Sequence, residues 1–165
     1  METEISRIAS WLQPQDILLD VDVRDRAQLF EQVATTIGGA NGLDPAPIRR
    51  ALERREQVGS TALGDRFAVP HACIAGITRP LTLYIRSRTG IAFDAPDGIP
   101  VDRILAIMAP TDGVKQDHLE LLALVARLFS DGGFRSRIDA AADAAEAADV
   151  FHSGIDRLVA AGKSG

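Results

Sequence analysis

The sequence predicts an α/β fold, in which a mixed β-sheet is flanked by helices on both faces of a single-domain sandwich. Apolar residues recur with helical spacing near both ends of the chain, whereas extended apolar segments occupy its middle. Residues 104–109 are apolar throughout, which is typical of a central strand buried on both faces. Strands and helices do not alternate regularly, so a doubly wound nucleotide-binding fold is disfavoured.

Composition indicates one globular domain. The chain has 165 residues, of which 46% are hydrophobic and 25% charged. We expect a domain spanning 1–165, with its core at about 5–150 and a disordered tail at 161–165. The net charge of −5 disfavours free nucleic acid and an anionic membrane as partners. No signal peptide or membrane insertion is expected, and the single cysteine, Cys73, fits a cytoplasmic protein.

Four elements are predicted in the first third of the chain. Branched residues indicate a strand at 17–21, and apolar residues three and four apart indicate helices at 25–37 and 45–57 and a short amphipathic helix or docking arm at 4–12. Asp44 is the predicted N-cap of the last of these helices, because a proline follows it at the first helical position.

The most informative stretch begins at Arg55. This arginine ends the apolar stripe of its helix, so we expect its side chain over the rim of the core. Two glycines and two hydroxyl side chains predict a turn at 59–64, and a short buried strand is predicted at 67–69. Pro70 restricts the backbone on both sides of it, so His71 is expected at a strand end on stiff backbone, followed by a loop.

The second half of the chain is predicted to contain strands at 81–88, 91–93 and 104–109, and a Pro-Asp-Gly turn at 95–98. Asp117 is the predicted N-cap of the next helix, with Glu120 completing a capping box. Asp131-Gly132-Gly133 ends that helix. A short helix from about 134 and an alanine-rich helix at about 140–150 complete the prediction.

The polar residues favour phosphoryl chemistry. The glycine turn lacks both the lysine of a Walker loop and the three-glycine dinucleotide pattern. A site for a phosphoryl group can be built from histidine, arginine and a helix N-terminus. The chain has His71, Arg55 and a predicted helix N-terminus that carries His118. Histidine is nucleophilic near neutral pH, arginine binds phosphate oxygens with two donors, and helix N-termini attract anions. An ordinary exposed position for His118 is an equally weighted alternative.

Neither a metal nor an organic cofactor is expected. His71, Cys73 and His118 are potential zinc ligands, but the chain has one cysteine and none of the paired motifs of zinc sites. Cys73 is interpreted as a small packing residue, and His152 as a solvent-facing side chain in the alanine-rich end.

Five segments together resemble a known protein family. The chain resembles the IIA proteins of the phosphoenolpyruvate-dependent phosphotransferase system, fructose/mannitol class, and most closely their nitrogen-regulatory branch. The similarity covers roughly 5–150 and implies the mannitol/fructose IIA fold, a mixed sheet flanked by helices. The segments that carry it are Arg55-Glu56-Gln57, 59–64, Ala68-Val69-Pro70-His71, 93–98 and Asp117-His118-Leu119.

The resemblance implies a histidine phosphocarrier with a nitrogen-related regulatory role in signalling. His71 would accept a phosphoryl group on Nε2 from an HPr-type histidine phosphocarrier protein. Arg55 would stabilise the phosphate and His118 would be auxiliary, while Ser60 and Thr61 would contribute to phosphate binding. No metal or nucleotide is implied, and whether such a phosphotransferase-type carrier counts as an enzyme stays open. The regulated target protein is not specified by the resemblance.

Two alternatives to a regulatory phosphocarrier are kept. One is a sugar-uptake IIA component that donates phosphate to a separate IIB protein. The other is a regulatory binding module of the same fold that is not phosphorylated. Relatives usually have glycine after the Pro-His pair, whereas this chain has Ala72, which favours the second alternative if its Cβ narrows access to His71.

Overall fold

The structure is a computed structural model that describes residues 12–113 and 115–163. It forms two compact units, one spanning Leu18–Gly113 and the other combining the N-terminal segment up to Ile17 with the segment from Val114 onward. Each unit is considered by itself below. Residues 4–11 of the predicted helix at 4–12 lie outside the described residues, and a single-domain organisation stays a prediction.

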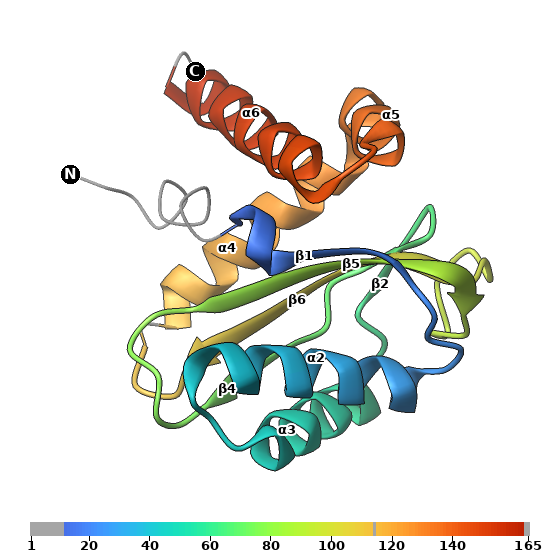
Figure 1. Cartoon of the computed structure of the whole chain (residues 1–165). Helices are drawn as coiled ribbons and strands as arrows, with labels where there is room; N and C mark the ends of the chain where they lie inside the picture. The colour runs from blue at the N-terminus through green and yellow to red at the C-terminus, as the bar shows by residue number, and fades with distance from the viewer. Residues whose placement is uncertain (1–11, 114, 164–165) are drawn as a thin grey trace. The chain divides into compact units, whose positions relative to one another are not determined.

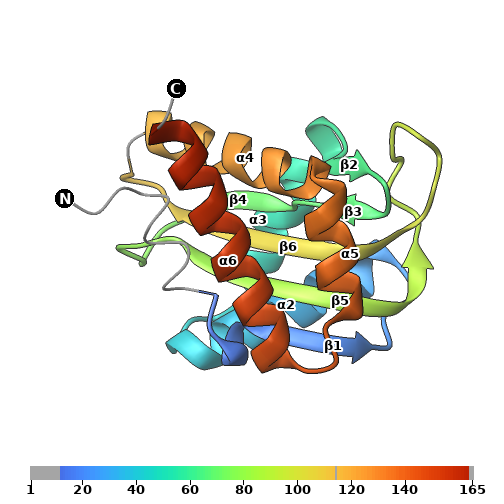
Figure 2. The same cartoon turned by 90° about the horizontal axis from the view of Figure 1, so that it is seen from above.

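A six-stranded mixed sheet is the framework of the Leu18–Gly113 unit (Figure 1). Its order is β1–β5–β6–β3–β2, and β4 pairs with β6 further along the same edge (Figure 2). β5 is antiparallel to β6, whereas β3 and β4 are parallel to it. The strands are β1 (Ile17–Val21), β2 (Ala62–Gly64), β3 (Phe67–Ala68), β4 (His71–Ile74), β5 (Leu81–Ile91) and β6 (Val101–Pro110).

β6 is the predicted central strand. Its residues 104–109 are almost fully buried and it pairs with β5 on one side and with β3 and β4 on the other. The predicted turn before it also forms, since the Gly98 N–H donates to the Ala95 carbonyl at 3.0 Å. Hydrogen bonds from the N–H groups of Asp65 and Ile99 to the carboxylate of Asp97 lower the pKa of that side chain.

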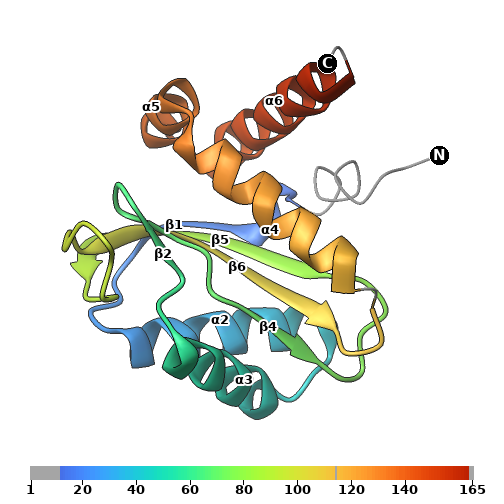
Figure 3. The same ribbon diagram turned by 180° about the vertical axis from the view of Figure 1, so that it is seen from behind.

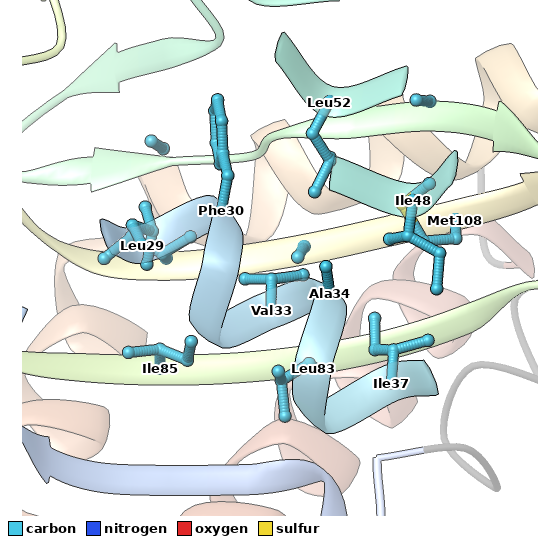
Figure 4. Packing of buried hydrophobic residues seen from close by; sticks show 14 of the residues in the cluster. Leu29, Phe30, Val33, Ala34, Ile37, Ile48, Leu52, Leu83, Ile85 and Met108 are labelled. Atoms are coloured by element: carbon cyan, nitrogen blue, oxygen red, sulfur yellow. The ribbon is translucent and has the colours of Figure 1, made fainter. Parts of the chain in front are cut away.

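Helices α2 (Arg26–Asn41) and α3 (Pro45–Val58) pack together on one face of this sheet (Figures 1 and 3). The predicted N-cap of α3 is confirmed, because the Asp44 carboxylate accepts the N–H of Ala46 at 3.1 Å. α2 ends four residues later than predicted, at a left-handed Gly42. The apolar sides of both helices and the sheet share one core, which includes Phe30, Val33, Ile48, Leu52, Leu83 and Met108 (Figure 4).

The other unit contains three helices, α4 (Lys115–Ser130), α5 (Gly132–Ala140) and α6 (Ala144–Lys163), after a short 3-10 helix, η1 (Pro14–Asp16). Phe129, Phe134 and Phe151 contribute one ring from each α-helix to its core, with centroids 5.3–6.3 Å apart. A Cβ on Gly154 would approach Leu128 Cδ1 to 2.8 Å, so the absence of a side chain there permits the close packing of α6.

Several predicted boundaries are wrong. α4 begins at Lys115, so Asp117 lies inside its first turn and not at the predicted N-cap position. α5 begins at Gly132, two residues before the predicted start at about 134, and Asp131 caps it by accepting the N–H groups of Gly133 and Phe134. α6 continues to Lys163, where a disordered tail was expected from 161. β5 continues to Ile91 and ends there, so Ala92 and Phe93 of the predicted strand at 91–93 are not part of a strand.

The predicted fold class, an α/β fold with a mixed sheet and flanking helices, is confirmed. Two strands were missed: β2 lies in the segment 59–64 that was expected to be a turn, and the residues after His71 were expected to form a loop. They form β4 instead, which pairs in register with Ile107–Pro110 of β6.

Candidate functional site

His71 is the first residue of β4, and two residues, Val69 and Pro70, separate it from the end of β3. The link between the two strands is held against β6, because the Ile107 N–H donates to the Pro70 carbonyl at 3.0 Å. The imidazole is half-buried, and its Nδ1 lies 2.8 Å from the carbonyl oxygen of Val69. A carbonyl oxygen only accepts hydrogen bonds, so Nδ1 carries the proton. In the neutral ring the lone pair is therefore on Nε2, which is the nucleophilic nitrogen.

Ala72 points away from the His71 ring. Successive side chains of a strand lie on opposite faces, and Ala72 and Ile74 belong to the core shared with α2 and α3. The φ angle of Ala72 is not positive, so its backbone conformation is that of an ordinary strand. Its Cβ therefore does not narrow access to His71. Cys73 lies on the same face as His71 and is exposed, so the prediction of a packing role for it is wrong.

The substitution Ala72→Gly is expected to leave the chemistry of His71 unchanged. It should lower the free energy of unfolding by about 1 kcal/mol, because glycine within a strand is entropically unfavourable and a buried methyl group is lost. Thermal denaturation measures this loss as a Tm decrease of roughly 2–4 °C. A several-fold faster modification of His71 in the variant would show that Ala72 does restrict access.

Arg55 lies in the last turn of α3, at the position that the sequence predicts for it. Its side chain is half-buried, and its Nη1 donates to the carbonyl oxygen of Gly59 at 2.9 Å. This contact fixes the guanidinium group against the turn that follows the helix. The remaining donors of the group are suited to an oxyanion, because a guanidinium offers five N–H groups in one plane.

Ser60 and Thr61 have partners within the protein. The Thr61 hydroxyl donates to Glu56 Oε1 at 2.7 Å, and its N–H donates to Glu56 Oε2 at 3.0 Å. The Ser60 hydroxyl donates to the carbonyl of Phe93 and accepts the N–H of Ala62 at 3.1 Å. The hydroxyl groups of Ser60 and Thr61 therefore both donate their protons to other groups of the protein. Phosphate binding by these two residues stays a prediction.

Glu56 is the residue of this region that sequence reasoning missed. It is 8% exposed and lies on the face of α3 that buries Ile48 and Leu52. The signal was available, because Glu56 follows Leu52 by four residues and so continues the apolar stripe. A carboxylate at such a position requires hydrogen-bond partners, and Thr61 supplies two of them.

The predicted site residues fall in both units. Arg55, Ser60, Thr61 and His71 belong to the Leu18–Gly113 unit, where hydrogen bonds connect the 59–61 turn to α3 and to Val69. His118 belongs to the other unit, in the first turn of α4 as predicted, and is half-buried. The prediction that His152 faces solvent is wrong, because its Nε2 lies 3.0 Å from the Leu12 carbonyl.

His118 gives the protein a pH-dependent stability. Burial lowers the pKa of its imidazole below the ordinary value of 6.5. The unfolded chain therefore binds this proton at higher pH, so the free energy of unfolding falls as pH decreases through about 6.5, and the loss is complete below the folded-state pKa. Urea titrations between about pH 8 and 5 should show a larger loss for the wild type than for His118→Asn. Equal pH dependence in both proteins would contradict this.

Within the described residues, no group of three or more His, Cys, Asp or Glu side chains is arranged to hold a metal ion. In the same part of the chain, no helix has the length and apolar character needed to cross a membrane.

Comparison with known proteins connects both units to one family. The model of the phosphoenolpyruvate-dependent sugar phosphotransferase system EIIA 2 family matches residues 10–154. A nitrogen regulatory protein of Bradyrhizobium diazoefficiens is 31% identical over 137 residues, covering 83% of this chain and 89% of that protein. The mannitol-specific phosphotransferase enzyme IIA component of Staphylococcus aureus is 30% identical, with coverage of 82% and 91%. The crystal structure of nitrogen regulatory protein IIA-Ntr from Neisseria meningitidis matches with a TM-score of 0.83 at 33% identity, covering 88% of this chain and 99% of that one.

Proposed function

The chain belongs to the phosphoenolpyruvate-dependent sugar phosphotransferase system EIIA 2 family, and on this premise we propose that His71 is its phosphoacceptor. The observation that carries the proposal is the hydrogen bond from Nδ1 to the Val69 carbonyl. This bond selects the tautomer in which Nε2 is the nucleophile. The donor is an HPr-type histidine phosphocarrier protein, and the protein works in the cytoplasm.

The transfer is an in-line displacement between two imidazoles. The lone pair of His71 Nε2 forms the new nitrogen–phosphorus bond, while the bond from phosphorus to the donor histidine breaks and its electron pair returns to the donor ring. The His71 ring gains positive charge as the bond forms. Its Nδ1–H donates more strongly to the Val69 carbonyl in that state, so the hydrogen bond stabilises the product.

Arg55 is proposed to bind the equatorial oxygens of the phosphoryl group as charge builds on them. His118 is proposed as an auxiliary residue, because burial lowers the pKa of its imidazole and so favours the neutral form, which has one hydrogen-bond donor and one acceptor. Ser60 and Thr61 are proposed to contribute the polar turn beside the phosphate. No metal or nucleotide enters these steps.

A nitrogen-related regulatory role is favoured over sugar uptake. Nitrogen regulatory proteins are among the relatives by sequence and by structure, and the match in structure covers nearly all of the Neisseria protein. The mannitol-specific relative keeps the sugar-uptake alternative, in which a separate IIB protein receives the phosphate. The second alternative, an unphosphorylated binding module, loses its one supporting feature, because the Cβ of Ala72 lies in the core.

The test is incubation of the purified protein with phosphoenolpyruvate, the general phosphotransferase enzyme and an HPr-type carrier. The proposal predicts a mass increase of one phosphoryl group, which is lost in acid and stable in alkali. No mass increase would support the unphosphorylated module. Adding candidate IIB proteins then separates the remaining two roles, because only a sugar-uptake component should pass its phosphate to one of them.

A further inference from the structure

A buried carboxylate holds the turn next to the candidate phosphoacceptor. Glu56 extends from the last turn of α3 and accepts both the N–H and the hydroxyl of Thr61, at 3.0 Å and 2.7 Å. Its side chain is 5% exposed. Hydrogen bonds to a charged acceptor are stronger than those between neutral groups, and burial limits competition from water. The Thr61 backbone is therefore fixed relative to the helix.

A chain of hydrogen bonds leads from this carboxylate to His71. The carbonyl oxygen of Thr61 accepts the N–H of Val69 at 3.0 Å. The carbonyl oxygen of Val69 in turn lies 2.8 Å from Nδ1 of His71. Val69 thus connects the turn to the imidazole, with its N–H bonded to Thr61 and its C=O bonded to the ring. Any shift of Thr61 moves the acceptor that selects the His71 tautomer.

Arg26 is a cation near Glu56 in this unit. Its Nη1 lies 4.0 Å from Glu56 Oε2 and 3.9 Å from Asp94 Oδ2, and its guanidinium carbon lies 5.9 Å from the centre of the Phe93 ring. The Phe93 carbonyl also accepts the hydroxyl of Ser60. The turn is therefore attached to α3 on one side and to the segment after β5 on the other.

We propose that Glu56 is a positioning residue for phosphoryl transfer, which orients the His71 ring through Thr61 and Val69. The inference rests on the proposed role of His71. It goes further because it makes a buried residue that does not contact the phosphate responsible for the orientation of the His71 ring, and so of the nitrogen that accepts the phosphoryl group. The required property is the reach of the Glu56 side chain to Thr61, and its charge is secondary.

Three substitutions separate reach from charge. Glu56→Gln keeps both contacts, because its oxygen can accept the Thr61 N–H and its amide can donate to the hydroxyl oxygen. Glu56→Ala removes both contacts. Glu56→Asp keeps the charge but is one methylene shorter. Glu53→Ala is the matched control, since Glu53 lies on the same helix one turn earlier and is only half-buried.

The primary measurement is the 15N NMR spectrum of the His71 ring in the unphosphorylated protein above the pKa of the ring. In the wild type and in Glu56→Gln, Nδ1 should appear as a protonated nitrogen and Nε2 as an unprotonated one. In Glu56→Ala the two resonances should move toward each other, because both tautomers become populated. Phosphoryl acceptance from the carrier should then slow by roughly tenfold or more in Glu56→Ala, and remain near the wild-type rate in Glu56→Gln and Glu53→Ala.

Unchanged ring resonances and an unchanged rate in folded Glu56→Ala would overturn the inference. If Glu56→Ala does not fold, Glu56→Gln and Glu56→Asp test the inference in its place. A positioning role requires the ring resonances and the rate of Glu56→Gln to resemble those of the wild type, and those of Glu56→Asp to deviate. If Glu56→Asp resembled the wild type and Glu56→Gln deviated, the effect would be assigned to charge, and the inference would also be overturned. The NMR measurement requires no phosphorylation, so a wild-type protein that accepts no phosphate contradicts the proposed function alone.

Discussion

Replacing His71 with alanine is expected to abolish phosphorylation by the carrier while the protein stays folded. The nucleophilic nitrogen is lost, and neither of the chain's other histidines has the same setting. His118 lies in a helix first turn in the other unit, and the Nε2 of His152 is next to the Leu12 carbonyl. The loss of one half-buried ring and its hydrogen bond should cost about 1 kcal/mol, which a domain of this size tolerates.

Two histidine variants complete this test. His152→Ala should be phosphorylated at the wild-type rate, because its ring is proposed to have only a structural contact. His118→Ala should be phosphorylated detectably but more slowly, or should be impaired in onward transfer, as expected of an auxiliary residue. Residual acid-labile phosphate in His71→Ala would contradict the assignment.

Replacing Arg55 with alanine is expected to slow phosphorylation by roughly 100-fold, the usual effect of removing one donor that stabilises developing charge. Stability should change by only about 0.5–1 kcal/mol, because the Arg55 side chain is half-buried and makes one hydrogen bond to the Gly59 carbonyl. Stopped-flow or quench measurements of acceptance, together with thermal denaturation, separate these two effects.

Arg54→Ala is the matched control for this prediction. Arg54 is the preceding residue of α3 and is exposed, with its Nε bonded back to the Arg50 carbonyl at 3.4 Å. Its removal should change neither the rate nor the stability appreciably. Arg55→Lys should be intermediate, because lysine keeps the charge but lacks the planar pair of donors. A large loss of stability in Arg55→Ala with an unchanged rate would assign Arg55 to folding.

Local signals explain which elements the sequence predicts well. β6 is apolar over six consecutive residues, and α3 begins with an Asp-Pro pair, so both were predicted within a few residues of their ends. The turn at 95–98 follows from its proline and glycine. These elements depend on interactions between neighbours in the sequence, which pattern analysis detects directly.

Non-local interactions explain the errors. β4 is four residues long and forms because β6 offers a parallel partner, which no local pattern around His71 announces. Asp117 and Glu120 have capping-box spacing, but acidic residues are also favourable within a first turn, and the helix begins earlier, at Lys115. The end of α6 is an exception: the helix extends to Lys163, and Phe151, Ile155 and Leu158 carry the helical spacing past the alanine-rich segment, which a local pattern could have shown.

The candidate site shows the same division between residues with local signals and residues that depend on non-local contacts. Arg55 and His71 could be predicted because a proline and a helical stripe fix their local positions. Glu56 could not be assigned a role, since its partner Thr61 depends on how the 59–61 turn folds back onto α3. The opposite faces of Ala72 and His71 also required β4 to be recognised as a strand.

The most direct test of His71 as the phosphoacceptor is to locate the phosphate on the wild-type protein. The protein is labelled through phosphoenolpyruvate, the general enzyme and the carrier, digested under mild alkaline conditions, and mapped by peptide mass, while 15N–31P NMR identifies the bonded nitrogen. We expect one phosphoryl group, on Nε2 of His71. Phosphate on Nδ1 of His71, on His118 or on His152 would contradict this.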